Sequence, residues 1–350
     1  MRLSRDELKS LMKNKLMAAG LHEDDADTTA EILTWSDERG YHSHGSVRVE
    51  YYSERIAKGG ITVDPKMTWK QTGPCSGMLD GDNGIGYVVA KRGMAHAIEL
   101  AKENGVAIVG MRRLSHSGSI GYYTEMAAEQ GLAAISMCQS DPMAVPVGGT
   151  EPYYGTNPIS FSVPSADGRI VVFDMATTVQ AWGKILDKRS RGESIPDTWA
   201  VDEKGIPVTD PNKGNALLPI AGAKGYGLMM MVDIFSGILT GVPFGGHVSS
   251  MYHDLSKGRD LGQLHIVIDP DRFCGKDAFL KAVSQSLDEL HAIPTAPGYD
   301  QVYYPGERAN IRKEKAYAQG GIEIVDDIVK YLKSDDIHYN RYDHKNRFAE

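Results

Sequence analysis

The chain has 350 residues, of which 41% are hydrophobic and 24% charged; this composition is that of a globular protein with roughly two or three domains, and it excludes a disordered or fibrous chain. The formal net charge is -8 at pH 7, and the pI is near 5.8. Because lysine and arginine are also dispersed along the chain, we expect no nucleic acid as a partner.

The first residues mix acidic and basic side chains and lack the apolar core of a signal peptide. No apolar run reaches the ~18 residues of a membrane span. We therefore expect a cytoplasmic protein with no membrane partner. The three cysteines, Cys75, Cys138 and Cys274, show neither CxxC spacing nor the even count of a disulfide framework, and HExxH is absent. No metal site is expected.

Helices are predicted for the N-terminal part of the chain. Ser4 followed by Glu7 forms a capping box, which opens a helix that ends at about residue 19. Residues 21–39 carry a second apolar pattern with the period of a helix. From about Cys75 onward, the pattern changes to alternating helices and strands.

A third helix is predicted over residues 44–58, with Ser43 as its cap and two glycines at its end. In such a helix His44, Arg48 and Tyr52 fall at i, i+4 and i+8, so they share one face. We expect this face to present a group of polar donors to a site.

Polar residues follow two apolar strands in the next part of the chain. The predicted elements are a helix over 88–104, a strand over 105–111, a helix over 120–130 and a strand over 132–138. The first strand leads to His116 and the second to Ser140. Since open α/β sheets usually bind ligands at the ends of their strands, we expect both side chains to contribute to a site.

The remaining elements are predicted as a hairpin over 159–163 and 169–174, a helix that begins at 174–178, a surface excursion over 190–222, a helix from Lys224 to about Leu239, a loop over 241–262, a strand over 264–268, and helices over 277–293 and 321–333. The helix that begins at Lys224 is rich in methionine and apolar on more than one face, so we expect it in the core. The tail after Ser334 is polar and is expected at the surface.

Two common enzyme signatures are absent. The glycine cluster Gly81–Gly86 has Val89 where the third glycine of GxGxxG belongs, and no strand is predicted to feed it, so we reject a classical Rossmann fold. Ser115 and Ser117 do not form the GxSxG elbow of a serine hydrolase, so we reject that class as well.

His116 is the first candidate for chemistry. A neutral imidazole, with an ordinary pKa of about 6.5, can take the proton of a hydroxyl group while a hydride leaves the adjacent carbon. Oxidation of an alcohol at neutral pH therefore suits a histidine at a strand end. The alternative, at this point, is that His116 is one of eleven histidines without a chemical role.

Arg48 is the second candidate. A guanidinium group can fix the carboxylate of a 2-hydroxy acid through two parallel hydrogen bonds. Its neighbours His44 and Tyr52 favour this interpretation, whereas pairing with Glu50 or Glu54 would make it an ordinary surface arginine.

Ser140, Asp174 and Lys224 complete the set. Each adjoins an apolar segment where the chain is expected to turn. Asp174 can accept hydrogen bonds from a ribose or a nicotinamide carboxamide, and Lys224 can reach a phosphate near the start of a helix. Taken singly, each residue also fits a helix cap or a solvated polar group.

Seven short motifs of the chain, taken together with their order and spacing, resemble those of the malate/L-lactate dehydrogenase family of the non-Rossmann type. The resemblance covers about residues 4–333 and lies in His42-Ser43-His44-Gly45 with Arg48 and Tyr52, Leu114-Ser115-His116-Ser117-Gly118, Asp141-Pro142, Gly155-Thr156-Asn157-Pro158, Phe173-Asp174-Met175-Ala176-Thr177, Lys224-Gly225-Tyr226-Gly227 and Pro305-Gly306-Glu307. It implies an NAD-dependent dehydrogenase acting on a small 2-hydroxy acid.

The resemblance also implies a role for each matching residue. His116 is implied as the proton acceptor, and His44, Arg48 and Tyr52 are implied to face the substrate. The residues implied to bind NAD are Ser140, Asp174, Met175, Ala176, Lys224, Gly306, Glu307 and Arg308.

The family's fold is α/β, with a non-Rossmann mixed sheet for the dinucleotide and a mainly helical domain from both termini. We therefore expect a helical N-terminal part at 1–74, an NAD-binding domain at 75–270, and C-terminal helices at 271–350 that pack back on the N-terminal part. Because family members are dimers or larger, a homo-oligomer is expected. Our hypothesis is that the segment 241–262, with Met251 and Arg259, contributes to a neighbouring subunit's site.

The substrate within the family stays open at this stage. Malate, L-lactate, a diketo sugar acid such as diketogulonate, and a cyclic imino acid are alternatives that keep the cofactor. A binding protein that lost its activity is an alternative from another class. It predicts disrupted motifs, whereas Arg48, His116 and Lys224 are all present.

Overall fold

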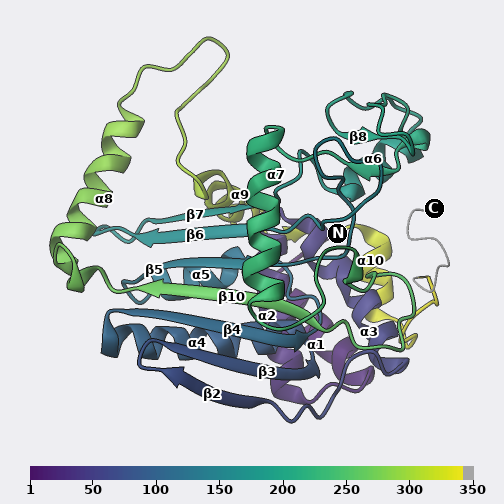
Figure 1. The fold of residues 1–350 in the computed structure, drawn as a ribbon, viewed down its shortest axis with the longest axis horizontal. Coiled ribbons are helices and arrows are strands. Elements are labelled where there is room, and N and C mark those ends of the chain that lie inside the picture. The colour runs from purple at the N-terminus through teal and green to yellow at the C-terminus, as the bar shows by residue number, and fades with distance from the viewer. Residues whose placement is uncertain (342–350) are drawn as a thin grey trace.

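A seven-stranded mixed sheet of order β2-β3-β4-β10-β5-β6-β7 forms the centre of the protein (Figure 1). The structure is a computed structural model that describes residues 1–341. Strands β3 and β4 are parallel, and the other neighbouring pairs are antiparallel. The sheet strands are β2 (Thr68–Gly73), β3 (Ser76–Gly84), β4 (Val106–Leu114), β5 (Ala133–Cys138), β6 (Ile159–Pro164), β7 (Ile170–Met175) and β10 (Leu261–Ile268).

Helices cover both faces of this sheet. Figure 1 shows α4 and α5 behind the sheet and α7 crossing its front. The helices are α1 (Arg5–Ala18), α2 (Glu23–Glu38), α3 (Val49–Ala57), α4 (Gly86–Asn104), α5 (Gly121–Ala128), α6 (Trp182–Ser190), α7 (Ala223–Asp233), α8 (Lys276–His291), α9 (Glu307–Ala318) and α10 (Asp326–Lys333). No helix within residues 1–341 has the length and apolarity needed to cross a membrane.

The two ends of the described chain meet in the helical part. Strand β1 (Arg2–Leu3) pairs with β11 (Ile322–Glu323), and α10 packs on α1. The ammonium group of Lys15 donates to the carbonyl oxygens of Ser334 and Asp336 at 2.5 and 2.7 Å, which holds the start of the polar tail at the surface. The expected mixed-sheet α/β fold with a helical part from both termini is confirmed, whereas the limits 1–74, 75–270 and 271–350 stay a prediction.

Ser4 caps α1 as predicted: its hydroxyl oxygen accepts the backbone N–H of Glu7 at 3.2 Å. The predicted third helix, however, begins five residues later than residue 44. Residues 42–44 and 46–48 form two 3₁₀ turns, and α3 starts at Val49. The buried carboxylate of Asp37 accepts hydrogen bonds from His42 Nδ1 at 2.9 Å and from the Ser46 N–H at 2.7 Å, and these bonds hold the turns. The expectation that His44, Arg48 and Tyr52 share one face of a helix is therefore wrong.

Two other predictions need correction, and one helix was missed. Strand β3 does feed the glycine cluster Gly81–Gly86, and α4 starts at Gly86. No helix begins at 174–178, because this segment is held by backbone hydrogen bonds such as Thr177 N–H to Thr156 oxygen at 2.8 Å; the next helix is α6. Helix α9 was not predicted, since only Ala309 in it is buried and its apolar pattern is weak.

Helix α7 is not a core helix. Val232 is buried against the sheet and Met229 against α6 and the excursion, but Met230 and Met231 are exposed. The π-helix Ile234–Ile238 that follows also exposes Ile238. Helix α7 has apolar residues on both sides, but the described chain covers only one of them. The outer side is therefore an apolar surface of residues 1–341.

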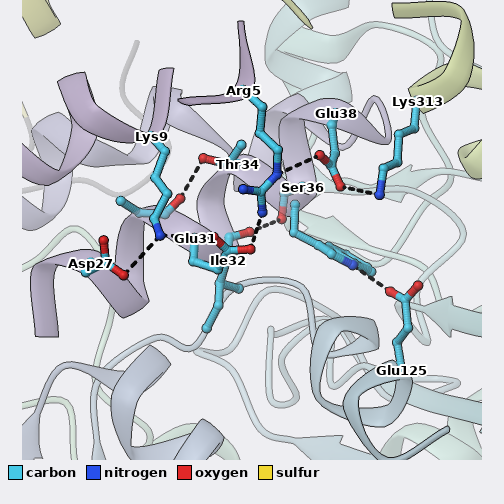
Figure 2. Close-up of polar contacts among 12 residues, drawn as sticks. Arg5, Lys9, Asp27, Glu31, Ile32, Thr34, Ser36, Glu38, Glu125 and Lys313 are labelled. Carbon is cyan, nitrogen blue, oxygen red and sulfur yellow. Dashed lines mark hydrogen bonds and ion pairs between the residues drawn. The ribbon is translucent and has the colours of Figure 1, made fainter. Parts of the chain in front are cut away.

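A buried ionic network joins the helical part. Glu38, at the end of α2, contacts Arg5 from α1 and the ammonium group of Lys313 from α9 (Figure 2). It also forms an ion pair with Arg39. The Tyr317 hydroxyl donates to the same carboxylate. The Glu38 side chain is only 2% exposed, so water cannot solvate its carboxylate. The charge is balanced instead by the neighbouring cations.

We expect Glu38→Gln to lower the free energy of unfolding by about 3 kcal/mol, because it leaves partly buried cations without their carboxylate. Urea unfolding at equilibrium measures this change. Glu323→Gln is the matched control, since Glu323 pairs with Arg2 at the surface and its side chain is 75% exposed. The control should cost less than about 1 kcal/mol. Equal losses in the two variants would contradict the assigned role of Glu38.

Candidate active site

A pocket of about 530 Å³ lies where the helical part, the end of β5, the segment 241–262 and α6 come together. Its volume is in the range of small-molecule sites. The lining residues on which the chemistry depends are Ser43, His44, Arg48, His116, Ser140, Asp141, Tyr252 and Arg259. Four of the predicted site residues, His44, Arg48, His116 and Ser140, are therefore brought together.

His116 lies in the loop after β4, held against the start of α4. The Ser115 hydroxyl accepts the N–H of Gly86, the first residue of α4, at 2.8 Å. A Cβ atom on Gly86 would lie 2.1 Å from the Ser115 carbonyl oxygen, so glycine is needed for this close approach. Behind the pocket, His116 Nδ1 is 2.6 Å from the Tyr52 hydroxyl oxygen. Tyr52 thus supports His116 from the rear and does not line the pocket.

The imidazole of His116 is held neutral. Burial lowers its pKa well below 6.5, and the nearby His44, Arg48 and Arg259 lower it further. Because the unprotonated ring is the form that can accept a proton, His116 is present at neutral pH in the form required of a base.

His44 and Arg48 reach the pocket from the two 3₁₀ turns. The ring of His44 stacks on that of His116 with centroids 5.7 Å apart, and burial followed by the charge of Arg48 lowers the pKa of His44 to about 4. Arg48 Nε donates to the Ser43 carbonyl oxygen at 2.7 Å, and its Nη1 donates to the Tyr252 hydroxyl at 3.0 Å. These two bonds fix the guanidinium plane at the pocket wall.

Arg259 is a second guanidinium group in the pocket. It is only 2% exposed and lies 3.5 Å from a carboxylate oxygen of Asp141, whose other oxygen accepts the Met251 N–H at 3.0 Å. The Ser249 carbonyl oxygen accepts a further bond from Arg259 at 2.8 Å. Arg259 and Met251 thus line the pocket of their own chain, and a contribution of this segment to a neighbouring subunit's site stays a hypothesis.

The other residues implied to bind a dinucleotide lie outside this pocket. Asp174 is at the end of β7, where its carboxylate accepts the N–H of Gly121 at the start of α5 at 2.8 Å. Lys224 is exposed in the first turn of α7. Gly306 precedes α9 and packs against the backbone of β7, since a Cβ atom there would lie 3.0 Å from Val172 N and O.

Glu307 and Arg308 form the first turn of α9. The carboxylate of Glu307 accepts hydrogen bonds from the backbone N–H of Tyr304 at 3.1 Å and from His291 Nε2 at 3.0 Å. The Arg308 guanidinium lies 4.5 Å from the centre of the Tyr303 ring. These side chains therefore stabilise the N-terminal turn of α9, which lies beside the edge strand β7.

A string of hydrogen bonds joins the pocket to the start of α7. The Ser140 and Thr156 hydroxyls are 3.1 Å apart, the Thr177 N–H donates to the Thr156 oxygen at 2.8 Å, and the Ile220 N–H donates to the Thr177 oxygen at 2.9 Å. The segment with Met175 and Ala176 thus lies between Ser140 and the turn that leads to Lys224. An extended ligand could follow this string from the pocket to the positive end of α7.

Burial raises the pKa of Asp174 to about 6, although the hydrogen bond from Gly121 acts in the opposite direction. In the folded state Asp174 therefore binds a proton more tightly than in the unfolded chain, so its contribution to stability rises as the pH falls from about 6 to about 4. We expect the wild type to gain stability relative to Asp174→Asn over this range, measured by urea unfolding at several pH values. A difference that does not change with pH would contradict the shift.

Sequence reasoning assigned no role to several pocket residues. Asp141 belonged to a motif but was given no function, and Tyr252 was not considered. Residues 180–184, 186 and 187, at and within the start of α6, form one wall of the pocket. The periodicity of a sequence does not indicate which end of a helix faces a site. The position of α6 at the pocket is seen only from the way the excursion 190–222 packs on the rest of the protein.

The fold and the sequence are those of a known class of proteins. The sequence pattern of the malate/L-lactate dehydrogenase family matches residues 3–333. The chain belongs to this family.

Individual relatives narrow the comparison. The chain is 57% identical to the ureidoglycolate dehydrogenase (NAD(+)) of Escherichia coli K12 over 350 residues, which is 100% of both chains. It is 37% identical to the malate dehydrogenase of Pyrococcus horikoshii over 323 residues, 89% of each chain. The solved structure of sulfolactate dehydrogenase from Methanocaldococcus jannaschii matches with a TM-score of 0.89 and 35% identity, covering 95% of this chain and 96% of that one.

Proposed function

We propose that the protein is an NAD-dependent dehydrogenase that oxidises (S)-ureidoglycolate to oxalurate. The reaction would belong to the cytoplasmic degradation of allantoin, which recovers purine nitrogen. The similarity to the E. coli enzyme over the full length of both chains supports the substrate and the cofactor. The observation that carries the reaction type is the joining, in one pocket, of a neutral imidazole at His116 with the guanidinium groups of Arg48 and Arg259.

The geometry suits the oxidation of a 2-hydroxy acid. Arg48 holds the substrate carboxylate, and Arg259, already paired with Asp141, adds positive charge to the same wall. His116 accepts the hydroxyl proton as the C–H bond breaks and the carbonyl forms. NAD, when bound, would supply the acceptor for the hydride that leaves the hydroxyl-bearing carbon, since a nicotinamide ring can take up that hydrogen with two electrons. His44 and Tyr52 keep the imidazole of His116 in place.

Of the residues proposed for NAD, Ser140, Met175 and Ala176 lie along the string of hydrogen bonds that leads from the pocket toward Lys224. Ser140 is at the pocket, Asp174 and Met175 end β7 and are followed by Ala176, and Gly306 to Arg308 lie beside β7. Lys224, with the N–H groups of the first turn of α7, suits the pyrophosphate because a helix start and an ammonium group both attract anions. The chain thus offers donors and positive charge where a dinucleotide needs them.

The experiment is to follow NADH absorbance with purified protein, comparing (S)-ureidoglycolate with L-malate and L-lactate, and NAD with NADP. We expect ureidoglycolate with NAD to give the highest kcat/KM. Preference for malate or lactate would overturn the substrate but keep the reaction type. No turnover of any 2-hydroxy acid would overturn the reaction type.

We further propose that the enzyme is a homo-oligomer that buries the outer side of α7 and the sheet beside it. Register pairing places Ile108, Ile266, Ile135, Phe161 and Phe173 in one row across five strands. Three members of this row, Ile108, Phe161 and Phe173, are 37 to 42% exposed. An apolar surface that extends over a sheet and a helix is typical of an interface between subunits.

Sedimentation velocity tests this proposal. Phe161→Glu is expected to shift the protein toward the monomer, since it places a charge within the apolar row. Ile206→Glu is the matched control, because Ile206 is an exposed apolar residue in the excursion, outside this surface. A wild type that sediments as a monomer would overturn the proposal.

A further inference from the structure

Tyr87 extends the contact behind His116 into a chain of three residues. The Tyr87 hydroxyl oxygen is 3.0 Å from that of Tyr52, which is 2.6 Å from His116 Nδ1. The two tyrosine rings meet edge to face, with centroids 5.4 Å apart and planes at 86°. Both tyrosines are fully buried at 0% exposure, so their hydroxyl groups depend on protein partners.

The fold builds this chain from distant segments. Tyr87 lies in the first turn of α4, Tyr52 in α3 and His116 in the loop after β4. Gly118 in that loop has a φ of 74°, and a Cβ atom there would lie 2.4 Å from a ring carbon of Tyr87. The loop that carries His116 therefore packs directly on the Tyr87 ring.

The reaction sets the direction of the hydrogen bonds. If His116 accepts the substrate proton at Nε2, its own ring proton must be on Nδ1, where it is donated to the Tyr52 oxygen. The Tyr52 hydroxyl then has to donate to another acceptor, and the Tyr87 oxygen is 3.0 Å away. Because burial raises the pKa of both hydroxyls, the Tyr52 proton is present to be donated.

Without the Tyr87 oxygen, the Tyr52 hydroxyl would turn toward His116 and donate to Nδ1. The ring proton of His116 would then move to Nε2, the nitrogen that has to accept the substrate proton. The imidazole would stay in place but in the unreactive tautomer.

We propose that Tyr87 is a positioning residue, which accepts the Tyr52 hydroxyl proton and thereby keeps His116 in the tautomer with a free lone pair at Nε2. The kinetic part of this inference rests on the proposed function, since it takes His116 as the base. The tautomer itself is a property of the protein without substrate.

The first test is the tautomer of His116, read by NMR of protein labelled with ¹⁵N-histidine, with His116→Asn to assign its signals. We expect the proton on Nδ1 in the wild type and on Nε2 in Tyr87→Phe. Tyr51→Phe is the matched control, because Tyr51 packs on Tyr52 with ring centroids 5.1 Å apart, and its hydroxyl is not a member of the chain. The control should keep the wild-type tautomer. The same tautomer in the wild type and Tyr87→Phe would overturn the inference, whether or not any substrate is turned over.

The second test is a double-mutant cycle on kcat/KM for the best substrate. Tyr87→Phe is expected to lower kcat/KM about tenfold in the wild-type background, which is the effect of one lost buried hydrogen bond. In a Tyr52→Phe background the same change should have less than about a twofold effect, since Tyr87 acts through Tyr52. Equal losses in both backgrounds would mean a general packing role and would overturn the inference. Failure of the wild type to oxidise ureidoglycolate counts against the proposed function, and the tautomer test still decides the role of Tyr87.

Discussion

His116→Ala is expected to lower kcat by about 10²-fold or more, with only a modest change in the affinity for NAD. The reason is that a positioned base contributes a factor of this order, while the residues proposed for the cofactor are left intact. Steady-state kinetics with ureidoglycolate gives kcat, and quenching of the protein's fluorescence on titration with NAD gives its dissociation constant.

His253→Ala is the matched control for this change. His253 is an exposed histidine beside Tyr252 in the segment that borders the pocket, so its loss tests the removal of an imidazole without the removal of the base. The control should keep kcat within about twofold. Near-normal turnover by His116→Ala would exclude His116 as the proton acceptor.

Arg48→Ala is expected to lower kcat/KM for ureidoglycolate by roughly 10²-fold. A guanidinium–carboxylate pair makes two charge-assisted hydrogen bonds, and their loss corresponds to about 3 kcal/mol. Arg48→Lys should recover only part of the loss, because an ammonium group cannot make the two parallel bonds.

Arg112→Ala is the control for Arg48, since Arg112 is a half-exposed arginine paired with Asp80 outside the pocket. If Arg48→Ala kept its kcat/KM while Arg259→Ala lost it, the carboxylate would be held by Arg259 instead. Arg259 lines the same pocket, so this pair of variants separates the two guanidinium groups.

The sequence predicted the frame of the fold well wherever a local signal was strong. The capping box at Ser4, the apolar runs that became β4 and β5, and the hairpin of β6 and β7 are all present. Helix boundaries were less accurate where the deciding contact is distant in sequence. The turns at 42–48 depend on Asp37, which accepts hydrogen bonds from His42 and Ser46.

The site was predictable in part for the same reason. His116 and Ser140 follow β4 and β5, which run in the same direction on either side of β10. Both residues therefore lie at one edge of the sheet, as the strand-end rule predicts. The pairing of Arg259 with Asp141 joins residues more than a hundred positions apart, and no spacing rule indicates it. The sequence did not indicate the role of Tyr87 either, because an aromatic residue on a helix is equally consistent with ordinary packing in the core.

The sequence by itself determined the α/β class, the presence of a histidine and an arginine suited to a 2-hydroxy acid, and the family resemblance. These depend on local periodicity and on the order of motifs, which a single chain displays directly. The tertiary structure decided which side chains meet at the pocket, which stand behind His116, and which side of α7 stays uncovered. Those features depend on contacts between distant segments, whose free energy is set by packing, burial and hydrogen-bond geometry in three dimensions and leaves no periodic trace in the sequence.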